Sequence, residues 1–151
     1  MPSIHFRTTV AAPPDEVYAA LATQDGLAGN WTDQLDVPEQ TGGVARFGFG
    51  PDWDKTLELR IDALEPGRLV QWTPVGGFPG WIGTSITWRL EPADAGGTVV
   101  HFTHGGWPEQ AADGEMAMCG YTWAMIINRL AQQVDRGERA PYFTAGEPLP
   151  R

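Results

Sequence analysis

Hydrophobic and polar residues alternate along much of the first hundred residues of the chain. The segment SIHFRTTV, residues 3–10, alternates in this way, and in KTLELRIDAL, residues 55–64, Leu57, Leu59 and Ile61 share one face. A period of two is typical of β-strands that bury one face and expose the other. These segments therefore predict half-buried strands in a largely antiparallel sheet.

Three later segments extend this pattern. GRLVQW, residues 67–72, predicts a short strand, and the turn ADAGG separates two longer ones. In WIGTSITWRL, residues 81–90, the residues on one face are Ile82, Thr84, Ile86, Trp88 and Leu90. In GTVVHFTH, residues 97–104, they are Val100, Phe102 and His104. We expect these faces to point toward the core.

Helical spacing replaces alternation in three places. Pro14 can start a short helix, with Asp15 suited to the positive end of its dipole, and QDGLAGN, residues 24–30, predicts a second short helix or a turn. Residues 113–136 carry apolar side chains every three or four positions, and Gly137 is placed to end that long helix. One long amphipathic helix on an antiparallel sheet is an α+β architecture.

The composition is that of one globular domain. We expect the 151 residues to form a domain over residues 1–138 and an irregular, proline-rich tail over 139–151. The formal net charge of −9 argues against binding to nucleic acid or to anionic membranes. The single cysteine allows no intrachain disulfide, and neither a signal peptide nor a membrane-spanning stretch is evident. We expect a cytoplasmic protein.

The candidate chemistry centres on tryptophan and histidine. Seven tryptophans are many for this length, and several could line a concave site. His101 and His104 are three apart on a strand, so they point to opposite faces and do not form a metal pair. His104 shares the inward face, where it could act as a general base or as a polar group at the strand end; we favour the structural role.

Several motifs resemble the START-like, or SRPBCC, superfamily. They are APPDEVYAAL, GNW ending at Trp31, LEPGRLVQW ending at Trp72, WRLEPADAGGTVVHFTHGGWP, and GYTWAMIINRLAQQVDRGE. Their order over residues 3–138 is most similar to the branch named after the activator of heat-shock-protein-90 ATPase homologue. This resemblance implies a helix-grip fold, in which a curved antiparallel sheet wraps a long C-terminal helix and two short helices follow the first strand.

The resemblance leaves the function open, because the superfamily includes carriers, cyclases, oxygenase domains and co-chaperone-like proteins. We expect a small, largely apolar or aromatic ligand between sheet and helix, and no cofactor or metal. The expected ligand-binding residues are Trp31, Trp72, Phe78, Trp81, Trp88, His104, Tyr121 and Trp123. The alternatives are a cofactor-independent cyclase or hydratase with His104 as acid and base, and a protein-interaction module. Loop tryptophans and a sheet edge could also pair two copies in a homodimer.

Overall fold

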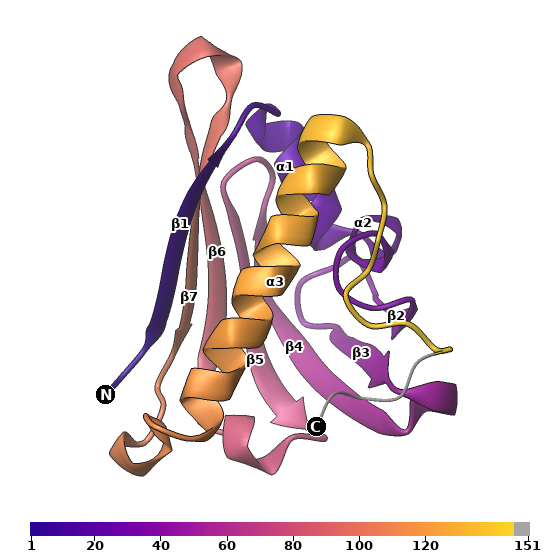
Figure 1. Ribbon diagram of the computed structural model, residues 1–151, viewed down its shortest axis with the longest axis vertical. Coiled ribbons are helices and arrows are strands. Elements are labelled where there is room, and N and C mark those ends of the chain that lie inside the picture. The colour runs from indigo at the N-terminus through magenta and orange to yellow at the C-terminus, as the bar shows by residue number, and fades with distance from the viewer. Residues whose placement is uncertain (147–151) are drawn as a thin grey trace.

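A seven-stranded antiparallel sheet forms the frame of the protein, seen in a computed structural model that describes residues 1–146. The strands lie side by side in the order β1-β7-β6-β5-β4-β3-β2 (Figure 1). Their bounds are β1 Ile4–Val10, β2 Gln34–Asp36, β3 Val44–Phe49, β4 Lys55–Glu65, β5 Leu69–Gly76, β6 Ser85–Pro92 and β7 Thr98–Gly105. Except for the pairing of β1 with β7, neighbours in the sheet are neighbours in sequence, so short connections suffice.

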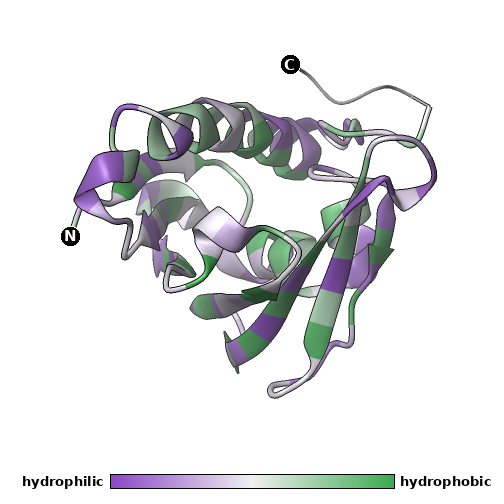
Figure 2. Ribbon diagram, turned by 90° about the horizontal axis from the view of Figure 1, so that it is seen from below, coloured by the Kyte–Doolittle hydropathy of each residue, from purple (hydrophilic) through white to green (hydrophobic). Residues whose placement is uncertain are grey.

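Helices cover one face of this sheet. They are α1 Pro14–Ala22, α2 Gln24–Ala28 and the long α3 Glu115–Arg136. Figure 1 shows α3 crossing in front of the strands, and Figure 2 shows it lying over the curved sheet, whose strands alternate between hydrophobic and hydrophilic residues. This is the helix-grip fold that the resemblance implied, so the predicted fold class is confirmed.

The long strand β4 shows how the pattern produces the core. Leu57, Leu59 and Ile61 are at most 2% exposed, as their alternation predicted. The pairing of β4 with β5 shifts register between Glu58 and Leu59 and again after Ile61. Such irregularities bend and twist a strand, which helps the sheet to curve around α3.

The predicted strand over residues 81–90 begins too early. Residues Pro79–Trp81 form a 3₁₀ turn, η2, and β6 starts only at Ser85. Gly83 adopts a positive φ of 94°, a conformation that interrupts an extended strand. Ile82, which we placed on the inward face, is consequently 57% exposed. Simple alternation could not reveal this break.

The helix ends follow the signals in the sequence. Pro14 is the first residue of α1, and Gly137 ends α3 in the left-handed conformation with φ of 70°. Near that end, the carboxylate of Asp135 accepts hydrogen bonds from the backbone N–H groups of Ala11 and Ala12, at 2.9–3.2 Å. The C-terminal part of α3 is therefore fastened to the connection between β1 and α1. No helix within residues 1–146 is long and apolar enough to cross a membrane.

The first part of the C-terminal tail packs against the domain. The backbone N–H groups of residues 140, 142 and 143 donate to the carbonyls of residues 29, 30 and 31. Phe143 also forms a parallel bridge with Thr32. The tail thus has an ordered place although it forms neither a helix nor a regular strand there; the prediction for residues 147–151 lies outside the described residues.

Candidate functional site

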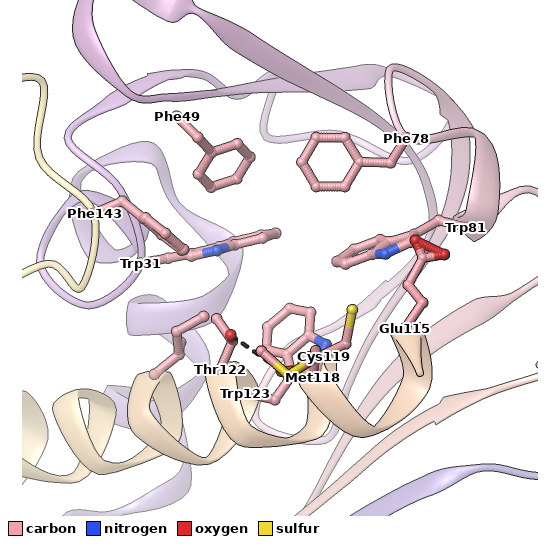
Figure 3. A pocket seen from close by; sticks show the side chains of 11 residues that line it. Trp31, Phe49, Phe78, Trp81, Glu115, Met118, Cys119, Thr122, Trp123 and Phe143 are labelled. Atoms are coloured by element: carbon pink, nitrogen blue, oxygen red, sulfur yellow. Dashed lines mark hydrogen bonds between the residues drawn. The ribbon is translucent and has the colours of Figure 1, made fainter. Parts of the chain in front are cut away.

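A cavity of about 310 Å³ lies beside the N-terminal half of α3. Side chains from α3, from the end of β3, from η2 and from the C-terminal tail surround it (Figure 3). The lining residues are Trp31, Phe49, Phe78, Trp81, Glu115, Met118, Cys119, Thr122, Trp123, Ile126 and Phe143. Segments far apart in the sequence therefore meet at this one place.

Aromatic rings form most of the wall. Trp31 follows α2, and its ring centre lies 5.8 Å from that of Phe49 and 5.1 Å from that of Trp123. Phe49 meets Phe143 of the tail edge to face at 4.9 Å. On the other side, η2 and the residue before it bring Phe78 and Trp81 into edge-to-face contact at 5.2 Å. These contacts hold the rings in fixed positions around the open space.

One stripe of α3 supplies the remaining wall. Glu115, Met118 or Cys119, Thr122 or Trp123, and Ile126 recur every three or four residues, so they lie on one side of the helix. Trp123 and Ile126 are 2% exposed, whereas Met118 is 63% exposed. The cavity is therefore closed at its inner end and reaches the surface near the start of α3.

A second row of aromatic side chains lies behind the lining. Trp72 stacks on Trp31 at 5.9 Å, and Trp88 meets Trp123 edge to face at 6.0 Å. Both are at most 2% exposed. The buried indole Nε1 of Trp88 has no hydrogen-bond partner within the described chain, which costs stability. These tryptophans support the lining without being part of it.

His104 also belongs to this second row. The indole N–H of Trp123 donates to its Nδ1 at 3.1 Å, so the ring proton must be on Nε2. Nε2 lies 2.9 Å from the hydroxyl of Thr84, which in turn donates to the carbonyl of Trp81 at 2.6 Å. The carbonyl of His104 itself accepts from the indole of Trp107 at 3.1 Å. Every polar atom of this buried side chain is satisfied by the protein.

Burial lowers the pKa of His104 to about 3. The residue is fully buried, and neither nitrogen is left for a ligand. Its neutral imidazole connects β7, α3 and the turn after η2 across the core. This arrangement does not support the hypothesis that His104 is an acid and base; it matches the structural role at the end of the strand.

Three polar side chains of α3 reach the lining: Glu115, Cys119 and Thr122, whose hydroxyl donates to the carbonyl of Met118 at 3.3 Å. Burial raises the pKa of the Cys119 thiol to about 11; a hydrogen bond from Trp81 opposes this shift, and the charge of Glu115 adds to it. Cys119 is therefore a neutral thiol at physiological pH and a poor nucleophile. Glu115, at the start of α3, is exposed and lies at the rim.

The structure gathers only some of the predicted ligand-binding residues at the cavity. Trp31, Phe78, Trp81 and Trp123 line it, whereas Trp72, Trp88 and His104 lie one layer behind. Tyr121 is 64% exposed and is not brought to the cavity. The loop tryptophans Trp31 and Trp107 are buried, so they offer no surface for pairing two copies. Of the seven tryptophans only Trp53 is partly exposed.

Several lining residues were missed. Met118, Cys119, Thr122 and Ile126 flank Trp123 at helical spacing, and a search of that helix face would have found them. Phe49 has the inward phase of Phe47 in β3, so the alternation of that strand could have found it. Phe143 lies in the tail, where no local pattern marks it. Among residues 1–146, no group of three His, Cys, Asp or Glu side chains is arranged to hold a metal ion.

Comparison with known proteins identifies the family. The sequence pattern of the Activator of Hsp90 ATPase homolog 1-like proteins matches residues 11–135, which is most of the chain. The chain belongs to the Activator of Hsp90 ATPase homolog 1-like family. No curated protein sequence matches it significantly.

Solved structures of similar proteins agree with this assignment. The solution structure of the Aha1 dimer from Colwellia psychrerythraea is 30% identical, with a TM-score of 0.81, over 91% of this chain and 99% of that one. A putative protein in the dynemicin biosynthetic locus is 23% identical, with a TM-score of 0.75, over 94% and 50% of the two chains. CalU16 from Micromonospora echinospora is 22% identical, with a TM-score of 0.72, over 92% and 77%. The last two proteins show only that they have the same fold as this chain.

Proposed function

We propose that this protein binds a small, largely apolar or aromatic molecule in the cavity beside α3. The observation that supports this proposal is the lining itself: six aromatic rings surround about 310 Å³ of space that reaches the surface at Met118. That volume is at the lower end of the range for ligand pockets, about 300–1,000 Å³. A planar ligand of one or two rings matches both the size and the chemistry.

The energetics favour such a ligand. Each aromatic pair adds about 0.5–1.5 kcal/mol beyond the burial of apolar surface. The walls are held in place by the second row of tryptophans, so little conformational entropy is lost when a ligand enters. Among residues 1–146, the cavity has no activated nucleophile and no partly exposed imidazole in its lining, since Cys119 stays protonated and His104 is engaged by the protein. Binding rather than catalysis is the function that these contacts support best.

Nuclear magnetic resonance of the indole N–H groups provides a direct test. On titration with 2-naphthylmethanol, a neutral two-ring probe, the signals of Trp31, Trp81 and Trp123 should shift in a saturable way. The signal of Trp53, which lies outside the lining, should stay in place. Absence of any shift, or equal shifts at all four positions, would overturn the proposal.

A pair of variants adds a steric control. Thr122→Trp places a large ring in the cavity, because Thr122 lies in the lining. It should abolish the saturable shifts that 2-naphthylmethanol causes in the indole signals. Ala124→Trp introduces the same side chain at an exposed position of α3 outside the lining and should bind the probe as the parent does. Equal binding by both variants would place the probe elsewhere on the protein.

We also propose that the protein forms a homodimer. The support is the dimeric state of the Colwellia psychrerythraea relative, together with Tyr121 on α3, which is 64% exposed and lies outside the cavity lining. Sedimentation equilibrium should show twice the monomer mass. Tyr121→Glu should reduce the fraction of the protein that is dimeric. A monomer at all concentrations would exclude this proposal without affecting the ligand site.

A further inference from the structure

Glu115 is an unexpected residue at the rim of an aromatic cavity. Among the described residues of the lining it is the only one with a charged side chain. No lysine, arginine or histidine within residues 1–146 lies within ion-pair distance of its carboxylate. The rim therefore presents an uncompensated negative charge to anything that enters.

A glycine gives this carboxylate its position. A Cβ atom at Gly80 would lie 1.7 Å from Oε1 of Glu115, so the carboxylate rests directly on the backbone of η2. The next residue is Trp81, and Figure 3 shows the carboxylate beside its indole. The negative charge and an aromatic ring of the lining thus share one corner of the cavity mouth.

Carboxylates and aromatic faces attract the same kind of partner. The face of an indole carries negative electrostatic potential, so it attracts an organic cation as a carboxylate does. The net charge of −9 strengthens the attraction for cations and repels anions over longer distances. The lining contains no positive group that could pair with an anionic ligand, within the part of the chain described.

We infer that the ligand of this cavity carries a cationic nitrogen, which lies between the carboxylate of Glu115 and the ring of Trp81, while its apolar part lies among the inner aromatic rings. This inference rests on the proposed function and specifies its ligand class as aromatic or alkyl amines. Neutral molecules of the same shape bind more weakly, and carboxylic acids are disfavoured.

Three probes of nearly equal size test the inference. They are 2-naphthylmethylamine, which is cationic at pH 7, neutral 2-naphthylmethanol, and anionic 2-naphthoate. Titration calorimetry at low salt should give the order amine, alcohol, acid, with the amine bound about tenfold more tightly than the alcohol. Raising the salt concentration should narrow this difference, because Glu115 is exposed to solvent.

Charge variants locate the source of the preference. Glu115→Gln should reduce the advantage of the amine over the alcohol to about threefold or less, the part that the rings supply. Glu109→Gln is the matched control: it removes an equal charge from an exposed position just before α3, outside the lining, and should keep the preference. Gly80→Ala should also reduce the preference for the amine, but less than Glu115→Gln does, because the added methyl group displaces the carboxylate.

The outcomes separate the two proposals. Binding of the alcohol and the amine with equal affinity would overturn the cation inference and leave the apolar site intact. A preference for the amine that survives in Glu115→Gln as fully as in Glu109→Gln would also overturn it. If none of the three probes binds, the proposed function itself fails.

Discussion

The space between sheet and helix contains two regions of similar composition but opposite character. In the closed half, the side chains of Trp72, Trp88, Phe102, His104 and Trp107 are at most 2% exposed and pack against one another. In the open half, Trp31, Phe49, Phe78 and Phe143 surround a cavity of about 310 Å³. Trp81 and Trp123 lie between the halves and contact both.

The difference arises from what faces the helix. In the closed half, rings on β6 and β7 meet α3 directly: Phe102 lies 4.7 Å and Trp88 6.0 Å from Trp123. α3 packs against β1 and α1, whereas the space near the end of β3 is bordered by a turn and by the tail. A turn and a tail cover that space less completely than a strand does. Aromatic content alone therefore does not decide whether a core is filled or hollow.

The largest expected effect is a change in the closed half. Trp88→Ala should lower the free energy of unfolding by about 3–5 kcal/mol, because it leaves a large void among packed rings. Urea denaturation measures this loss. Trp88→Phe is the control: it keeps a ring and removes the unpartnered Nε1–H, so it should cost less than half as much. A loss below about 1 kcal/mol for the alanine variant would show that this region is not tightly packed.

The next effect is a pH dependence of the free energy of unfolding, which arises from the burial of His104 in the closed half. Its pKa is lowered to about 3 when folded, against about 6.5 in the unfolded chain, so the unfolded state binds the proton first as the pH falls. Stability from this group is present above pH 6.5 and is lost as the pH falls from there toward 3. Between pH 7 and pH 5 the loss should be about 2 kcal/mol.

A histidine variant isolates that contribution. The difference in unfolding free energy between the parent and His104→Gln should narrow by about 2 kcal/mol between pH 7 and pH 5, because glutamine does not titrate. His101→Gln, on the outer face of β7, serves as the control. If the difference in unfolding free energy does not change with pH, the pKa of His104 is the same in the folded and unfolded states.

The smallest expected effect on stability comes from the open half. Phe143→Ala removes a half-buried ring that meets Phe49 edge to face, and should cost about 1 kcal/mol. It should also weaken the binding of 2-naphthylmethanol severalfold, since it opens one wall. Tyr142→Ala removes the neighbouring ring, which contacts Phe143 at 4.9 Å but lies outside the lining, so it should weaken binding less. Equal effects of both variants on binding would show that the tail acts only through stability.

The periodicity of hydrophobic residues in the sequence determined the strands and helices of the protein. Alternation in residues 55–64 predicted which side chains of β4 are buried, and Gly137 marked the end of α3. It also placed His104 and Trp88 on the inward face. These features depend on neighbours in sequence, through the strand period, the helix period and the conformational freedom of glycine.

Only the tertiary structure decided what the inward faces enclose. Periodicity shows that a side chain points inward, but not whether another segment meets it there. His104 is a satisfied core residue because Trp123 and Thr84, 19 and 20 positions away, supply its partners. The cavity exists because η2 and the tail, distant in sequence, cover the space beside Phe49 without filling it.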